Sequence, residues 1–106
     1  MLPKTHRLTT KECDTVLKEG RKIASPFFFA RMRPNSLSHT RYAIVVSKKF
    51  AKTAILRNTI RRRAYTITRD FISLPYDVMI VVSKDAVLAE KDIFQKELLT
   101  FLQKIK

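Results

Sequence analysis

The stretch from Tyr76 to Ser83, YDVMIVVS, constrains the fold more than any other part of the sequence. It is a near-continuous apolar run, which is typical of a strand buried on both faces and often paired in parallel. A second strand is predicted at Arg41–Ser47, RYAIVVS, and a long helical segment separates the two strands. Strand, helix, strand is therefore the natural unit here, with the helix packed on the sheet.

The residues on either side of this unit add two helices and two strands. A short helix is predicted at about Thr10–Glu19, ending at Gly20, where a helix commonly needs a left-handed residue. The pattern turns to β type from Lys22 to Arg33, and Glu90 to Ile105 is amphipathic, which predicts a closing helix. The expected fold is a two-layer α/β sandwich of order α-β-β-β-α-β-α, with about four strands in a mixed sheet.

The length of the chain predicts one domain, residues 1–106, because a compact unit typically holds about 100 to 150 residues. No apolar run approaches the roughly 20 residues of a membrane-spanning helix, and the N-terminus lacks the apolar core of a signal peptide. We therefore expect a cytoplasmic protein with no membrane contact. Cys13 is the single cysteine and has no disulfide partner, and two histidines are too few for a zinc site.

The positive charge is concentrated in one segment of the chain. The sequence has 22 Lys and Arg against 9 Asp and Glu, a formal net charge of +13. Residues 21–69 contain no acid, whereas the segments before and after them are close to neutral. Such a block predicts a surface for a polyanion better than it predicts a generic basic tail.

The helix between the two strands carries much of this charge on one face. At 100° per residue, the apolar positions form one stripe: Leu56, Ile60, Ala64, Ile67 and Phe71. Opposite them lie Asn58, Arg62, Tyr65 and Arg69, with Arg61 beside them and Arg57 and Arg63 on the flanks. The absence of acids and the preference for Arg predict phosphate contacts. Tyr65 either stacks on an unpaired base or covers the flank of the core, and the pattern favours neither.

A second mixed face is predicted on the strand that follows Pro26. Alternation places Phe27, Phe29, Arg31 and Arg33 on one side of this strand. Aromatics together with arginines suit base stacking and phosphate contact. An equally good interpretation is that Phe27 and Phe29 cover a helix.

The sequence contains no arrangement expected of a self-sufficient catalyst. A metal-dependent nuclease needs clustered carboxylates, and of the scattered acids only Asp70 adjoins the basic segment. One glycine cannot form a glycine-rich phosphate loop. The residues therefore favour an RNA binder. A ribosomal or ribosome-assembly protein is an alternative, and a free-standing nuclease would depend on Asp70 or Asp77.

Several motifs together resemble the protein component of bacterial ribonuclease P over nearly the whole chain. They are MLPK at the start, Arg7-Leu8, Val16 and Gly20, VSKK at Val46–Lys49, RNTIRRRAY at Arg57–Tyr65, and the final amphipathic helix. The resemblance implies a ribosomal-protein-like sandwich that binds a catalytic RNA and the 5′ leader of precursor tRNA. It also implies that the endonucleolytic, Mg²⁺-dependent hydrolysis takes place on the RNA, so that no residue of this chain is catalytic or binds a metal.

Two sets of site residues follow from the charge pattern and the resemblance together. Those expected to contact the catalytic RNA are Lys48, Lys49, Lys52, Arg57, Asn58, Arg61, Arg62, Tyr65 and Arg69. Those expected to line the leader cleft are Cys13, Leu17, Phe27, Phe29 and Arg31.

The chain departs from the family pattern at both predicted sites. Thr59 and Tyr65 stand where the family signature has arginines, so two donors are lost from the helix. Cys13 and Leu17 stand where the first helix usually carries aromatics, and Arg31 where the second strand commonly does. The expected cleft is therefore more aliphatic than is usual for the family, with Phe29 or Phe27 as the remaining stacking platforms.

Overall fold

The structure is a computed structural model that describes residue 8 and residues 10–35, 39–71 and 75–105, without the side chains of Thr10 and Ile105. Its elements are, in order, α1 (Thr10–Glu19), β1 (Arg21–Ala24), β2 (Phe28–Pro34), β3 (Arg41–Val46), α2 (Ala54–Thr68), β4 (Tyr76–Val82), α3 (Lys84–Leu88) and α4 (Lys91–Ile105). This confirms the predicted order with one addition, the five-residue helix α3. In the part of the chain described, no helix is both long and apolar enough to cross a membrane.

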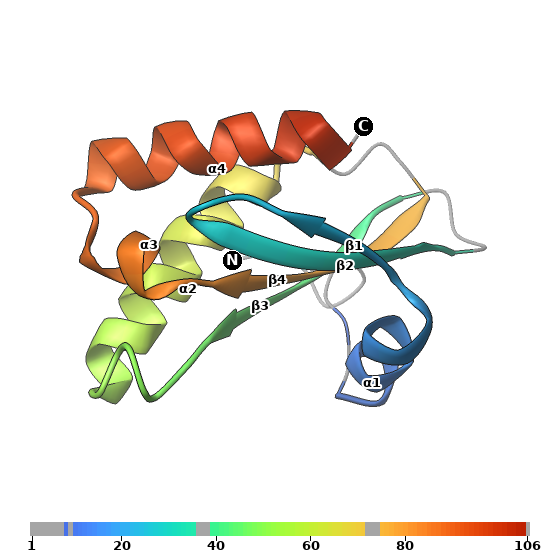
Figure 1. Cartoon of the computed structure of the whole chain (residues 1–106), viewed down its shortest axis with the longest axis horizontal. Helices are drawn as coiled ribbons and strands as arrows, with labels where there is room; N and C mark the ends of the chain where they lie inside the picture. Colours follow the sequence, from blue (N-terminus) through green and yellow to red (C-terminus); the bar gives the residue numbers. More distant parts are fainter. Residues whose placement is uncertain (1–7, 9, 36–38, 72–74, 106) are drawn as a thin grey trace.

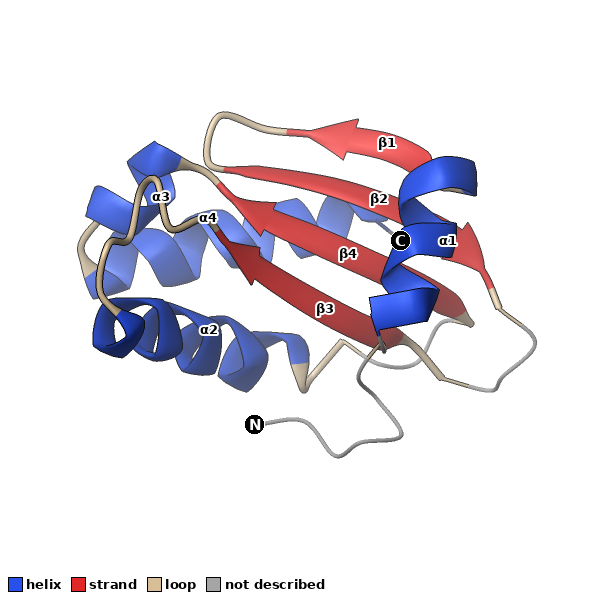
Figure 2. Cartoon of the chain, turned by 90° about the horizontal axis from the view of Figure 1, so that it is seen from below, coloured by secondary structure: helices blue, strands red, loops and turns tan. Residues whose placement is uncertain are grey.

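The four strands form one mixed sheet in the order β1-β2-β4-β3 (Figures 1 and 2). β4 lies between β2, to which it is antiparallel, and β3, to which it is parallel. Five of its seven residues are buried, which confirms the prediction of a strand covered on both faces. Strand, helix and strand over β3, α2 and β4 form the expected parallel unit.

The main hydrophobic core lies between the sheet and the helices α2 and α4. Phe28 is central to it, with its ring centroid 5.4 Å from that of Phe94 and 5.7 Å from that of Phe101. Ile60 of α2 and Ile80 of β4 are almost completely buried in the same cluster. Burying each such side chain stabilises the fold by about 1.5 to 3 kcal/mol, so this layer supplies most of the apolar stabilisation.

Helix α1 lies on the opposite face of the sheet and covers only part of it (Figure 2). Its Val16 is fully buried and packs in a small second cluster with Ala43 and Met79. The prediction of a left-handed Gly20 is wrong, because no glycine has a positive φ. The glycine is needed for space instead: a Cβ there would lie 2.3 Å from the carbonyl oxygen of Val16 and 3.1 Å from the backbone nitrogen of Met32.

The predicted alternation fails at the start of β2. Ser25 closes a tight turn, in which its Oγ accepts a hydrogen bond from the Phe28 amide at 3.1 Å and its amide donates to the Phe28 carbonyl at 2.8 Å. Phe27 therefore belongs to the turn and not to the strand, and its side chain packs against the main core. Phe27 and Phe29 do not share a face, which corrects the prediction that both line one cleft.

Candidate nucleic-acid interface

Helix α2 begins at a well-defined cap that also fixes the preceding connector. The Thr53 hydroxyl accepts a hydrogen bond from the Leu56 amide at 3.1 Å and so satisfies one of the free donors at the helix start. The guanidinium of Arg57 folds back, and its Nη1 donates to the Ala51 carbonyl at 2.9 Å and to the Lys52 carbonyl at 3.3 Å. Two bonds thus tie the basic connector to the first turns of α2.

The residues predicted to contact the catalytic RNA, apart from Tyr65, separate into exposed and half-buried groups. Exposed side chains belong to Lys48, Lys49, Lys52, Asn58, Arg62 and Arg69. Arg57 and Arg61 are half-buried, and Arg61 donates a hydrogen bond to the amide oxygen of Asn58. We call the six exposed residues and Arg61 the basic surface. Within the residues described, none of its cations forms an ion pair, so its charge is available to an anionic partner.

Tyr65 does not belong to this surface, and its predicted exposure is wrong. It is only 8% exposed, and its hydroxyl accepts a hydrogen bond from the Ile44 amide at 3.2 Å. The single-stripe prediction fails because α2 packs against both β3 and α4. Its buried arc is therefore wider than one stripe and takes in Tyr65 and Thr68 as well as Ile60, Ala64 and Ile67. Of the two interpretations of Tyr65, the structure supports the one that covers the core.

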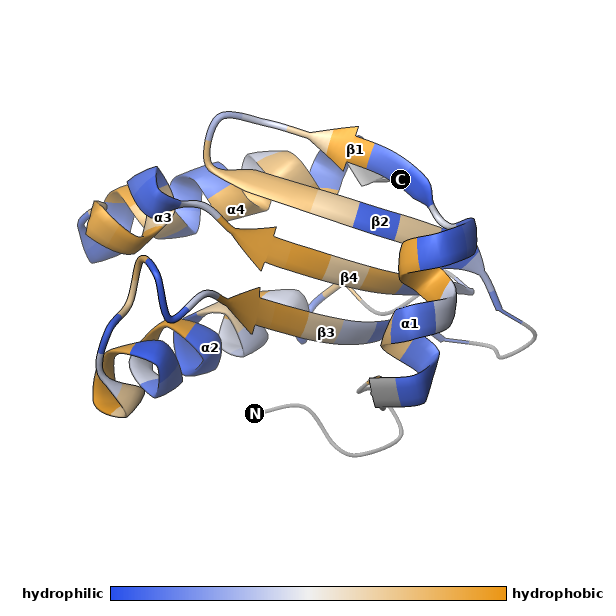
Figure 3. Cartoon of the chain, turned by 60° about the horizontal axis from the view of Figure 1, so that its bottom comes forward, coloured by the Kyte–Doolittle hydropathy of each residue, from blue (hydrophilic) through white to orange (hydrophobic). Residues whose placement is uncertain are grey.

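The sheet face that carries α1 remains open at one end. Phe29, Val81 and Val45 are register partners on neighbouring strands and form a continuous row across this face, which we call the apolar row. Val45 is 39% exposed, and Leu17 of α1, the helix that lies on this face, is 48% exposed. In Figure 3 the ribbons of β3 and β4 are coloured hydrophobic where they extend beyond α1. β3 leads from this end of the sheet directly into the basic connector.

Cationic side chains surround the aromatic member of the row. The Nζ of Lys22 lies 5.2 Å from the ring centroid of Phe29, and the Cζ of Arg31 lies 6.0 Å from it. Nη1 of Arg31 also donates to the Gly20 carbonyl at 3.5 Å, which holds the guanidinium beside the end of α1. An aromatic platform with two adjacent cations can stack a base and bind its phosphate.

Three of the predicted cleft residues thus surround this open face, and a fourth is partly withdrawn from it. Leu17 is exposed, and Phe29 and Arg31 are half-buried; Cys13 is also half-buried, but it packs against the Val16 cluster. Partial burial raises the pKa of the Cys13 thiol, and the nearby carboxylates of Asp14 and Glu12 raise it further.

Sequence reasoning missed Val45, Val81 and Lys22 as members of this face. Their alternation along each strand is visible in the sequence. Which strands are neighbours, and in what register, is visible only in the structure.

A charged network fixes α1 to the far end of the same face. Arg41 of β3 donates from Nε to Oδ1 of Asp77 at 2.8 Å and from Nη2 to Oδ2 at 2.7 Å, and its Nη1 donates to Glu12 of α1. Asn35 donates to Oδ1 of Asp77 at 2.8 Å. Burial alone would raise the pKa of Asp77, but these hydrogen bonds and the charges of Arg41 and Arg33 outweigh burial and lower it.

This network bears on the nuclease alternative. Both oxygens of Asp77 accept hydrogen bonds from Arg41, so this carboxylate positions a cation of the protein itself. Among the residues described, no three His, Cys, Asp or Glu side chains gather where they could hold a metal ion. Residues 1–7, with the MLPK motif, Arg7 and His6, lie outside the described part.

Comparison with known proteins gives a consistent result. Residues 2–106 match the family model described as Ribonuclease P. The chain is 38% identical over 82 residues to the ribonuclease P protein component of Aliivibrio salmonicida, which covers 73% of this chain and 67% of that protein. It is 35% identical over 89 residues to the ribonuclease P protein component of Synechococcus elongatus, covering 76% and 73% of the two chains.

Solved structures show the same fold. The RNase P protein of Staphylococcus aureus superposes with a TM-score of 0.85 at 26% identity, covering 97% of each chain. The RNase P protein of Thermotoga maritima superposes with a TM-score of 0.83 at 25% identity, covering 94% of this chain and 97% of that one.

Proposed function

The chain belongs to the ribonuclease P protein family, and on this premise we propose that it is the subunit that helps a catalytic RNA remove the 5′ leader of precursor tRNA. One observation carries the proposal beyond the family. Five cations of the acid-free segment are exposed and have no acidic partner in the described residues: Lys48, Lys49 and Lys52 of the connector and Arg62 and Arg69 of α2. A face of this kind needs a polyanion to offset its own repulsion.

In this proposal the basic surface docks on the catalytic RNA. Lys48, Lys49 and Lys52 in the connector and Arg62 and Arg69 on α2 bind phosphates, and Asn58 and Arg61 complete the surface. The arginines suit bidentate phosphate contact because the guanidinium is planar and keeps its charge.

The apolar row and its cations take the single-stranded leader. Stacking one base on an aromatic ring contributes about 1 to 3 kcal/mol, and Phe29 is the ring available on this face. Leu17 and Val45 form an aliphatic wall and floor, and Arg31 and Lys22 bind phosphate. Because β3 leads from this face into the basic connector, the leader site and the site for the catalytic RNA adjoin each other.

The hydrolysis itself belongs to the RNA in this proposal. Mg²⁺ bound by the catalytic RNA and the substrate would supply the activated water, and the side chains described here bind and orient the two RNAs. The complex works in the cytoplasm, where precursor tRNA is made.

Reconstitution tests the function. The protein alone should leave precursor tRNA uncut, and adding it to a bacterial ribonuclease P RNA at low magnesium should raise the cleavage rate. RNA that co-purifies with the protein should be ribonuclease P RNA. Failure to stimulate any bacterial ribonuclease P RNA would refute the proposal, and co-purified ribosomal RNA would favour a ribosomal role.

A single variant tests the leader site. Phe29→Ala should weaken the binding of precursor tRNA with a leader and leave the binding of mature tRNA unchanged. Its folding stability should stay close to that of the wild type, because Phe29 lies outside both core clusters. Ile93→Ala, an exposed apolar position on α4, is the matched control and should change neither affinity. Equal loss of affinity for both RNAs would place the leader elsewhere.

A further inference from the structure

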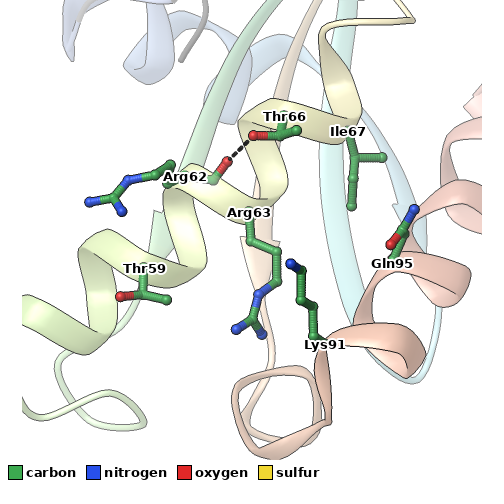
Figure 4. A pocket seen from close by; sticks show the side chains of 7 residues that line it. All are labelled: Thr59, Arg62, Arg63, Thr66, Ile67, Lys91 and Gln95. Atoms are coloured by element: carbon green, nitrogen blue, oxygen red, sulfur yellow. Dashed lines mark hydrogen bonds between the residues drawn. The ribbon is translucent and has the colours of Figure 1, made fainter.

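A groove between α2 and α4 lies beside the basic surface but is separate from the apolar row. Its volume is about 420 Å³, within the range of small-ligand sites. The polar side chains that line it are Thr59, Arg62, Arg63 and Thr66 of α2 and Lys91 and Gln95 of α4. Figure 4 shows Arg63 and Lys91 reaching into it from the two helices and passing alongside each other in opposite directions.

The charges of this groove are all of one sign. No carboxylate lines it, and among the residues described neither Arg63 nor Lys91 forms an ion pair. Asp92, the next residue along α4, lines a neighbouring hollow with Lys96. Arg63 and Lys91 come together from different helices without an acid and repel each other, and an anion between them removes that repulsion.

The two cations are held differently. The guanidinium of Arg63 lies over the ring of Phe94, 5.6 Å from its centroid, which restricts its position. Lys91 is the first residue of α4, where the helix dipole disfavours a cation. Its charge therefore does not serve helix stability, which points to a role in binding.

The hydroxyl groups in the groove contribute less. Thr59 donates to the Ile55 carbonyl at 2.9 Å, and Thr66 donates to the Arg62 carbonyl at 2.8 Å, so both protons are engaged within α2. Binding in the groove must then come from Arg63, Lys91 and the amide of Gln95. Such a set can recognise the charge of a phosphate.

We propose that the catalytic RNA extends past the basic surface and lays a second stretch of its phosphate backbone in this groove, bound by Arg63 and Lys91. Arg62 links the two regions, because it is exposed on the basic surface and also lines the groove. In Figure 4 its side chain points away from that of Arg63, toward the other side of α2. This inference rests on the proposed function and adds α4 to the RNA-binding surface.

Binding of ribonuclease P RNA, measured against salt concentration, tests this groove. Lys91→Gln should lower the affinity several-fold and reduce the slope of log K against log salt by about 0.7 to 0.9, the effect of one lost phosphate contact. Lys91→Glu should lower the affinity further, because the new carboxylate lies beside Arg63 and neutralises it as well. Lys96→Gln, an exposed lysine on the same helix outside the groove, is the matched control and should bind as the wild type does.

The outcomes separate this inference from the proposed function. If Arg62→Gln weakens binding while Lys91→Gln and Lys91→Glu bind as the wild type does, the RNA stops at the basic surface and the groove proposal is wrong. If the wild type binds no ribonuclease P RNA, the proposed function fails first. Urea unfolding of Lys91→Gln should show no loss of stability, because the substitution removes a positive charge that the helix dipole disfavours at the start of α4. At constant ionic strength, millimolar inorganic phosphate should lower the RNA affinity of the wild type no more than that of Lys91→Gln, and a loss confined to the wild type would make the groove a small-anion site.

Discussion

Replacing Tyr65 by phenylalanine tests the orientation of α2, on which the whole RNA-binding surface depends. Tyr65 is 8% exposed, and its hydroxyl accepts a hydrogen bond from the Ile44 amide. Because β3 is an edge strand, that amide has no second strand to bond to, and the tyrosine takes this place. Tyr65→Phe keeps the ring and its packing, so it opens no large cavity, but it leaves a buried donor without a partner. An unsatisfied buried group costs about 1 to 3 kcal/mol.

The measurement is equilibrium unfolding in urea together with RNA binding. With a slope of about 1 to 3 kcal/mol per molar urea, the midpoint should fall by on the order of 1 M. RNA affinity and its salt dependence should not change. Tyr76→Phe is the matched control, because the Tyr76 hydroxyl has no hydrogen bond among the described residues, and its stability should stay within about 0.5 kcal/mol of the wild type. Unchanged stability with weaker RNA binding in Tyr65→Phe would mean that this side chain faces the RNA and that the orientation of α2 is wrong.

Three further predictions concern the other face of the sheet. Asp77→Ala should lower the free energy of unfolding by about 3 kcal/mol, the lower end for a broken buried pair, because the Arg41 side chain is 21% exposed. The pKa of Asp77 is lowered in the folded state, so its contribution is present above the unfolded pKa near 3.9 and is lost as the pH falls through the folded value. The urea midpoint of the wild type should fall as the pH is lowered from 7 to 3 because this contribution is lost, and the midpoint of the variant should lack that part of the fall. Gly20→Ala should destabilise by about 1 to 3 kcal/mol because its Cβ meets the Val16 carbonyl, and a thermal midpoint equal to that of the wild type would contradict this steric argument. Cys13 should react with iodoacetamide at pH 8 more slowly than free cysteine, because partial burial and the nearby carboxylates raise its pKa, and full unfolding should remove the difference.

Local patterns in the sequence were enough to predict most of the fold. The run at Tyr76–Ser83 predicts a doubly buried strand, and β4 forms there at Tyr76–Val82, between β2 and β3. The helix predicted at Thr10–Glu19 has those bounds in the structure. Helix α3 could not be predicted, because five residues capped by Ser83 are too few to show a helical period.

The site was predictable where it depends on one element and not where elements meet. Exposure of Arg62 and Arg69 follows from the periodicity of a single helix. The burial of Tyr65 depends on β3 and α4 both packing against α2, and the pairing of Arg41 with Asp77 joins residues 36 positions apart. Phe27 was assigned to the wrong face because the turn at Ser25 leaves it outside β2, so the alternation that holds along the strand from Phe28 onward does not apply to it.

The position of β4 in the sheet sets the order in which the chain can fold. β2 and β3 are both complete by Val46, yet they are not neighbours, and each pairs with a strand that ends at Val82 of a chain of 106 residues. Among the described strands, β1 and β2 are the neighbouring pair that can form before β4 is made, and until then α2 has no complete sheet to pack on. The later part of the acid-free segment, β3 and α2, therefore lacks its partner strand until β4 has been made. A nascent chain in this state can meet RNA before its RNA-binding surface has folded. Non-specific RNA contact is then possible until β4 pairs with β2 and β3.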